Sequence, residues 1–170
     1  MKVYIEEQKF LQPLIIIGLS IGMFAVIIPV ISDWNEIIPQ SFIKNLPIFS
    51  GIIIIAVVFI LFLYLKLKTR IDEKGVYYQF FPFQWNSKFI PWKNIDKCYV
   101  RKYNAITEFG GWGIKFSFRK NIGKAVTTKG KIGLQLELKN GNKILIGTQK
   151  KEELKRTIQN YQHKFINHEN

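Results

Sequence analysis

Apart from its lysines and arginines, this 170-residue chain offers few residues that suggest chemistry. Cys98 is the only cysteine, and the two histidines, His163 and His168, lie in a polar C-terminal stretch. A single cysteine excludes an internal disulfide and a cysteine-based zinc site. The carboxylates show no spacing typical of an acid–base pair, and the sequence has no nucleophile motif and no Gly-rich phosphate loop leading into a helix. We therefore expect a non-enzymatic protein without a cofactor or a metal site.

The basic residues are the strongest chemical signal. From Lys66 onward the chain carries 22 of its 25 lysines and arginines but 8 of its 12 acidic residues, which gives this part a net charge of +14. Near an anionic bilayer, each basic side chain contributes about 1 kcal/mol of attraction. We expect contacts with anionic lipid headgroups or another ligand, with a merely solvated positive surface as the alternative. The candidate contacts are Lys66, Lys68 and Arg70, and then Arg119, Lys120, Lys124, Lys129 and Lys131.

An alternative pocket rests on Tyr99, Arg101 and Tyr103, which alternate along one predicted strand. An arginine between two tyrosines on one face suits a phosphate and a stacked base, so the chain would then be a ligand-gated membrane effector that senses a nucleotide. Such a face is more often ordinary sheet surface. Binding to nucleic acid would rest on charge alone, because no base-reading motif accompanies it, and we do not expect it.

The elements that position these residues begin with two apolar segments. Residues 11–32 and 45–65 contain no charged residue, and about 20 apolar residues suffice to cross a bilayer. A cleaved signal peptide is the alternative for the first segment, but Glu6 and Glu7 do not fit its basic start. Basic residues flank the outer ends of the segments more densely than the connection, which has only Lys44. This bias predicts a multi-pass protein with both termini in the cytoplasm.

Small residues in the first segment indicate close helix packing. Gly18 and Gly22 form a G-x-x-x-G pair, which lets two helices approach closely. Packing within the hairpin or formation of a homo-oligomer would both use this face. Neither segment contains the intramembrane charge that an ion path usually needs, so we expect the hairpin to be an anchor.

After Arg70 the hydrophobic pattern changes to a period of two, which is typical of half-buried strands. The clearest strand covers residues 132–138, and Asn140-Gly141 predicts a hairpin between it and residues 143–146. In residues 114–119, Phe116 is expected to point inward. Further strands are expected at residues 68–72, 76–81, 88–91, 96–103 and 124–128.

A helix is expected to close the chain. Leu154, Ile158, Tyr161 and Phe165 recur at helical spacing, which predicts an amphipathic helix over about residues 149–166 with Thr148 as its N-cap. Its apolar stripe would be buried most easily over the mouth of a curled sheet or barrel.

Three segments together resemble the bacterial pleckstrin-homology (PH) domains of small membrane proteins. They are Ile90-Pro-Trp-Lys-Asn-Ile95, Gly110-Gly-Trp-Gly-Ile114, and Asn140-Gly-Asn-Lys-Ile-Leu-Ile-Gly-Thr148. The resemblance implies a transmembrane hairpin in residues 1–66 and, in residues 67–170, a PH-like β-domain of about seven antiparallel strands with one C-terminal helix. It also implies a module of the bacterial inner membrane that binds a partner protein or anionic headgroups at the cytoplasmic surface. The turn Asp72-Glu73-Lys74-Gly75 lacks the basic cluster of lipid-binding eukaryotic PH domains, so phosphoinositide binding is not expected.

Overall fold

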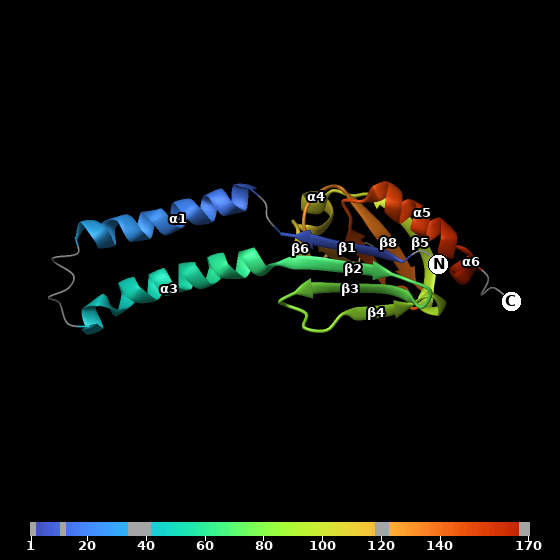
Figure 1. Cartoon of the computed structure of the whole chain (residues 1–170), viewed down its shortest axis with the longest axis horizontal. Helices are drawn as coiled ribbons and strands as arrows, with labels where there is room; N and C mark the ends of the chain where they lie inside the picture. The colour runs from blue at the N-terminus through green and yellow to red at the C-terminus, as the bar shows by residue number, and fades with distance from the viewer. Residues whose placement is uncertain (1–2, 11–12, 34–41, 118–122, 167–170) are drawn as a thin grey trace. The chain divides into compact units, whose positions relative to one another are not determined.

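The computed structural model describes residues 3–10, 13–33, 42–117 and 123–166 (Figure 1). The chain forms two compact units. One is Leu11–Tyr64, and the other joins Met1–Phe10 to Leu65–Asn170 and is called the β-domain below. We predicted from the sequence that residues 1–66 form one unit with the hairpin. In the structure, the residues before the first long helix belong to the β-domain.

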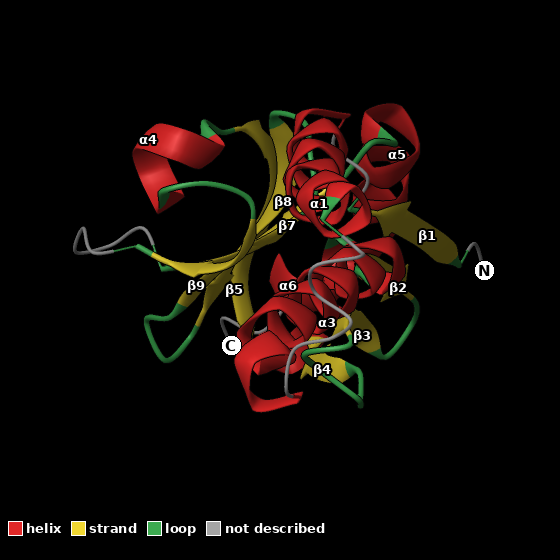
Figure 2. Cartoon of the chain, turned by 90° about the vertical axis from the view of Figure 1, so that its left-hand side faces the viewer, coloured by secondary structure: helices red, strands yellow, loops and turns green. Residues whose placement is uncertain are grey.

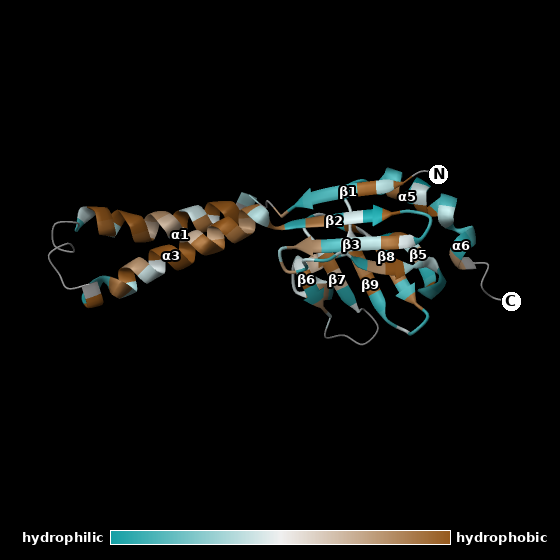
Figure 3. Ribbon diagram, turned by 60° about the horizontal axis from the view of Figure 1, so that its bottom comes forward, coloured by the Kyte–Doolittle hydropathy of each residue, from teal (hydrophilic) through white to brown (hydrophobic). Residues whose placement is uncertain are grey.

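The unit Leu11–Tyr64 contains two apolar helices, α1 (Pro13–Ser32) and α3 (Phe42–Tyr64). Both are long and apolar enough to cross a membrane, in agreement with the predicted segments 11–32 and 45–65. Only 6% and 0% of the residues in their apolar windows are buried within the protein, so neither is the core helix of a soluble unit. Figure 3 shows hydrophobic residues around both helices, a pattern that requires burial in protein or in lipid.

Four antiparallel strands form sheet A. They are β1 (Tyr4–Lys9), β2 (Lys66–Ile71), β3 (Gly75–Phe81) and β4 (Lys88–Pro91), in that order. The sequence did not predict β1, which pairs with β2 along its whole length and ends at the pair Lys9↔Lys66. The N–H of Phe10 then donates to the carbonyl oxygen of Leu65 at 2.9 Å. The two apolar helices are thus inserted in sequence between two neighbouring strands of one sheet.

Five strands form sheet B in the order β5-β8-β9-β7-β6. Their bounds are β5 (Ile95–Lys102), β6 (Gly113–Phe116), β7 (Lys124–Thr127), β8 (Ile132–Leu138) and β9 (Lys143–Gly147). β8 and β9 pair antiparallel, and Gly141 in their turn has φ 82°, which confirms the predicted hairpin. β7 and β9 are parallel, contrary to the antiparallel pairing expected.

The expectation of about seven strands in a curled sheet or barrel is wrong. Within the part of the chain that the structure describes there are nine strands, in separate sheets of four and five that do not close. Figure 2 shows sheet A and sheet B on two sides of the domain. The physical reason is the connection after β4, where the 3₁₀ turn η1 (Trp92–Asn94) interrupts the backbone before β5 begins, so β4 ends sheet A and β5 begins sheet B.

The centre of sheet B is buried on both faces. Ala125 and Val126 are neighbours in β7 and both have no exposed surface, as do Leu145 and, within 1%, Ile146 in β9. Neighbouring strand residues point to opposite faces, so each face must be covered. The short helix α4 (Ala105–Phe109) supplies part of this cover, because Phe109 packs in one cluster with Ala125 and Leu145.

The C-terminal helices carry the predicted apolar stripe. In α5 (Lys151–Tyr161), Leu154, Ile158 and Tyr161 are buried, and Phe165 in α6 (His163–Ile166) is 8% exposed. The Trp92 ring stacks on Tyr161 and Phe165, with centroid distances of 5.4 and 5.7 Å. The stripe therefore covers the aromatic side chain that follows β4.

The predicted N-cap is wrong. Lys150 is the N-cap of α5, and it makes no side-chain capping hydrogen bond. Thr148 is drawn away by β1, since its hydroxyl donates to the Glu6 carboxylate at 2.8 Å.

Candidate functional site

A pocket lined by several lysines lies between sheet A and sheet B. It has a volume of about 450 Å³ and is open to solvent on one side, between β4 of sheet A and β6, β7 and β9 of sheet B. We call it the lysine pocket. Its chemically distinctive lining consists of Lys88, Lys124, Lys143, Tyr78, Phe116 and Ser117.

Two lysines of this pocket have no acidic partner in the described part of the chain. Among the residues that the structure describes, no carboxylate lies within ion-pair distance of Lys88 or Lys124, whereas Lys143 pairs with Glu137 at 3.4 Å. The Lys124 ammonium lies 5.3 Å from the centroid of the Phe116 ring, where the face of the ring attracts a cation. The pocket therefore retains two uncompensated positive charges on different sheets.

The electrostatics of Lys124 reflect this arrangement. Burial lowers the pKa of its ammonium group, and the positive charge of Lys88 lowers the pKa further. Both effects disfavour the charged form of Lys124. An anion bound between the two ammonium groups would oppose the second effect, because a negative charge favours the charged form of Lys124.

A glycine holds the start of β7 against β9. Gly123 has φ 81°, and a Cβ atom there would lie 2.2 Å from the Lys143 carbonyl oxygen. The carbonyl oxygen of Gly123 also accepts a hydrogen bond from the N–H of Ser117 at 2.9 Å. This close backbone approach fixes Lys124 beside Phe116, its partner in the β6–β7 ladder.

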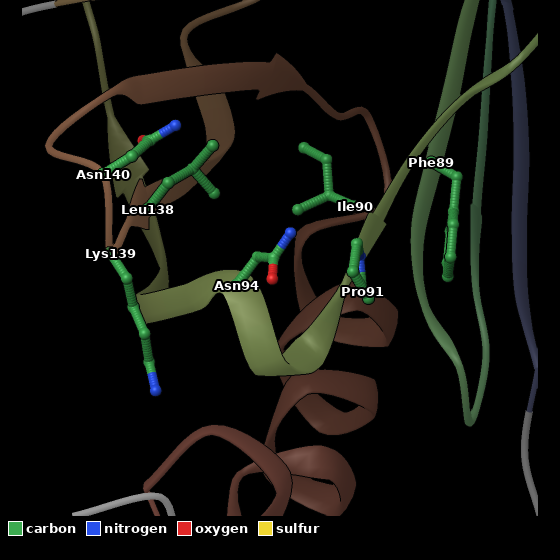
Figure 4. A pocket seen from close by; sticks show the side chains of 7 residues that line it. All are labelled: Phe89, Ile90, Pro91, Asn94, Leu138, Lys139 and Asn140. Atoms are coloured by element: carbon green, nitrogen blue, oxygen red, sulfur yellow. The ribbon is translucent and has the colours of Figure 1, made fainter.

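A second hollow of about 390 Å³ adjoins the lysine pocket and shares Leu138 with it. Figure 4 shows Ile90, Asn94 and Leu138 around one space, while the Lys139 side chain points away from it. Its lining combines apolar residues with the amides of Asn94 and Asn140. Lys139 is the one lysine that lines it, so the cluster of cations at this opening belongs to the lysine pocket.

The first predicted group, Lys66, Lys68 and Arg70, is partly neutralised by acidic neighbours. Lys66 and Lys68 lie 3.3 and 3.5 Å from the Glu7 carboxylate, and Arg70 lies 2.9 Å from that of Asp72. β1 brings Glu7 beside Lys66 and Lys68, whereas Arg70 pairs with Asp72 directly after β2.

The second predicted group is not gathered on one face. Lys124 begins β7, whereas Lys129 and Lys131 are exposed in the turn beyond its other end. At about 3.3 Å per residue, the two ends of β7 are about 10 Å apart, and Lys129 lies beyond the far end. Arg119 and Lys120 lie outside the described residues. Of this group, the lysine pocket contains Lys124.

The alternative pocket is occupied by the protein's own contacts. Arg101 pairs with Glu108 at 2.8 Å and donates to the Gln135 side chain at 2.9 Å. The Tyr99 hydroxyl donates to Glu137 at 2.7 Å, and this bond is the largest influence lowering the pKa of that carboxyl group. Tyr103 is only 4% exposed and belongs to the core cluster beneath α4. The three residues therefore do not present one open face to a ligand.

Sequence reasoning missed Lys88, Lys143 and Phe116 as site residues. Phe116 was expected to point inward, but its ring is 67% exposed, because β6 is the edge of sheet B and leads directly to the pocket. Nothing in the local sequence indicates that β4 lies opposite β7 and β9. Only the long-range pairing of strands brings these residues together.

Other chemistry has little support in the geometry. Cys98 is buried, and burial raises the pKa of its thiol well above the ordinary range. Within residues 3–10, 13–33, 42–117 and 123–166, no group of three or more His, Cys, Asp or Glu side chains is placed to hold a metal ion. The arrangement that stands out in these residues is a cationic pocket in which Lys88 and Lys124 have no carboxylate partner.

Comparison with known proteins adds no family assignment. No family model matches the sequence, and no curated protein matches it.

Proposed function

We propose that this protein is a non-enzymatic, membrane-anchored module whose β-domain binds a phosphate-bearing ligand beside the bilayer. The observation that carries the proposal is the pair Lys88 and Lys124, which face one pocket from two sheets without a carboxylate partner in the described chain. Lysine ammonium groups bind phosphate oxygens as compact point charges. In this proposal α1 and α3 are the anchor, in the bacterial inner membrane, with both termini in the cytoplasm.

The β-domain is proposed to be a divergent relative of the bacterial PH domains. Support comes from the buried Trp92 after Pro91, from the β8–β9 hairpin at Asn140-Gly141, and from the C-terminal helix that packs over Trp92. The two separate sheets and the additional strand β1 are departures from the barrel of that family. The lysine pocket lies between the two separate sheets.

A phosphate-bearing ligand is favoured over the two other expected partners. A nucleotide sensor would need the side chains of Tyr99 and Arg101, and these bind Glu137 and Glu108 instead. A partner protein has no comparable single observation in its favour. Anionic lipid headgroups and soluble phosphate compounds share the chemistry that the pocket would recognise.

The test measures ligand binding by the full chain in an uncharged detergent. Glycerol phosphate should raise the midpoint of thermal unfolding, since a ligand that binds only the folded state stabilises it in proportion to ligand occupancy. Lys88→Gln combined with Lys124→Gln should abolish this shift. The control pair Lys102→Gln and Lys155→Gln removes the same charge from exposed positions elsewhere in the β-domain and should retain it.

Nanodiscs distinguish the two sources of phosphate. If the ligand is a headgroup, phosphatidylglycerol discs should stabilise the protein relative to phosphatidylcholine discs, and the pocket variant should lose that difference. If it is a soluble compound, glycerol phosphate should act equally in both discs. If the pocket variant and the control variant lose the ligand-induced shift of the unfolding midpoint equally, a specific site is refuted.

A further inference from the structure

The loop between β3 and β4 exposes large aromatic side chains. It covers residues 81–87 and is called the aromatic loop. Phe83 is 62% exposed and Trp85 is 79% exposed. Large exposed apolar side chains that cluster on one segment mark an interaction surface.

The loop is ordered by its own polar groups. The Gln79 side chain donates to the carbonyl oxygens of Gln84 and Trp85 at 3.0 and 2.6 Å. The Gln84 side chain accepts from the Phe80 N–H at 3.1 Å, and the Gln84 N–H donates back to Phe80 at 2.9 Å. These glutamines turn inward to satisfy the backbone, while the apolar rings of Phe83 and Trp85 turn outward, the reverse of an ordinary water-exposed loop.

The strand register places this loop at one end of sheet A. Lys9 pairs with Lys66, and Lys66 pairs with Phe81, the first residue of the loop. Figure 1 shows the β3–β4 loop at the same end of the sheet as the end of β1 and the start of β2. The chain therefore leaves the β-domain for both apolar helices beside the aromatic loop.

Covalent distance then limits how far the loop lies from a membrane. Only Leu65 separates the last residue of α3, Tyr64, from Lys66. Two residue steps span at most about 7 Å, and a paired residue on the neighbouring strand lies about 5 Å further away. Phe81 is consequently within about 12 Å of the end of α3 in any orientation of the two units.

The charges around the loop suit a lipid interface. The Lys66 ammonium lies 6.0 Å from the Phe81 ring centroid, and the Phe81 and Trp85 rings make an edge contact at 5.8 Å. Lys88 follows the loop directly at the start of β4. Tryptophan rings with neighbouring lysines are the side chains that membrane interfaces favour.

We infer that the aromatic loop inserts Phe83 and Trp85 into the headgroup and upper acyl region of the bilayer that α1 and α3 cross. The inference rests on the membrane anchor in the proposed function but does not require the phosphate site. The insertion would hold the β-domain at the surface as a third contact, with the opening of the lysine pocket next to the headgroups.

The test is a depth measurement on the full chain, one copy per phosphatidylcholine nanodisc. A nitroxide label is attached at Trp85→Cys, and in separate samples at Glu73→Cys and Val57→Cys. Glu73 is exposed in the turn at the opposite end of sheet A, and Val57 lies in the middle of α3. The native Cys98 is buried with a raised pKa, so it should stay unlabelled.

The collision rate of each label is then measured with oxygen, which concentrates in lipid, and separately with a water-soluble nickel chelate. We expect the label at position 85 to collide mainly with oxygen and the label at position 73 mainly with nickel. Equal nickel collisions at positions 85 and 73, with position 57 deep in lipid, would overturn the loop insertion alone. Loss of nickel collisions at position 85 without a gain of oxygen collisions would indicate protein contact and also overturn it.

A label at position 57 that collides freely with nickel would overturn the membrane anchor itself, and with it this inference. Because the discs contain uncharged lipid and no soluble phosphate, none of these outcomes depends on the lysine pocket. Circular dichroism of each labelled variant should match that of the unlabelled protein. If the variant labelled at position 85 differs, the label at Phe83→Cys replaces it.

Discussion

The Glu6 carboxylate accepts a hydrogen bond from the Thr148 hydroxyl at 2.8 Å, across 142 residues of sequence. It also accepts from the Tyr4 hydroxyl and from the Gln149 N–H, the latter at 2.8 Å. Glu6 is only 4% exposed. One buried carboxylate therefore ties the strand before the apolar helices to the segment that begins the C-terminal helix.

Replacing this carboxylate should destabilise the β-domain. Glu6→Ala would leave three donors without their acceptor, and each buried polar group left unsatisfied costs roughly 1–3 kcal/mol. We expect a loss of about 3 kcal/mol or more in the free energy of unfolding, measured by thermal or denaturant unfolding in detergent.

Glu7→Ala is the matched control for this prediction. Glu7 is the next residue and is half-exposed, and its partners are the surface lysines Lys66 and Lys68. Surface ion pairs contribute at most about 1 kcal/mol. Equal effects of the two substitutions would contradict the role assigned to Glu6.

Two glycines with the same backbone conformation should respond differently to substitution. Gly123 and Gly141 have φ angles of 81° and 82°, but an added Cβ would meet the Lys143 carbonyl oxygen at 2.2 Å in the first and open space in the second. Gly141→Ala should cost about 1–2 kcal/mol, the strain of a left-handed conformation.

Gly123→Ala carries the same strain and must also move the start of β7 away from β9. We expect a loss on the order of 3 kcal/mol or more, together with weaker binding of glycerol phosphate because Lys124 is displaced. Unfolding midpoints and binding titrations of both variants measure the difference. Similar stability of the two variants would show that the close approach is absent in solution.

The pKa of Lys124 gives the pocket a pH dependence. Burial and the charge of Lys88 lower this pKa in the folded protein, whereas in the unfolded chain it should return to about 10.4. Between the two values the unfolded chain binds more protons, so the contribution of Lys124 to stability rises with pH over this window. Affinity for a phosphate ligand should fall over the same window, because the ammonium is lost.

Carbon NMR of the lysine Cε atoms measures this titration. Lys88→Gln should raise the pKa of Lys124 part of the way to its ordinary value, because the burial remains. Lys102→Gln should leave it unchanged. A Lys124 pKa that does not respond to Lys88→Gln would mean that the two charges do not share one pocket.

The pairing of β1 with β2 also makes a prediction about membrane topology. Since Met1–Phe10 and Leu65–Asn170 belong to one unit, tags at the two termini should lie on the same side of the membrane. In intact cells an impermeant reagent should label neither tag, and in inverted vesicles it should label both. Labelling of one tag alone would contradict the β1–β2 pairing, and labelling of both in intact cells would reverse the proposed orientation.

The elements that depend on a local pattern could be predicted from the amino-acid sequence. Two uncharged apolar stretches are sufficient to predict α1 and α3, because only length and hydrophobicity matter for such helices. The alternation in residues 132–138 and the turn at Asn140-Gly141 likewise predicted β8, β9 and their pairing. The apolar stripe on α5 could also be predicted, because the spacing of residues along a helix is a local property of the sequence.

The contacts between distant segments of the chain could not be predicted and are known only from the folded structure. The inward-facing residues of β1 include the polar Glu6 and Gln8, which is not the pattern of a core strand. β1 is nevertheless buried on this face, because Thr148 and Thr128 from distant segments donate hydrogen bonds to these two side chains. The lysine pocket has the same origin, since Lys88 and Lys124 meet through the arrangement of two sheets. The sequence separation of Lys88 and Lys124 does not predict that they lie close together, because neighbours on different strands are fixed by long-range backbone pairing.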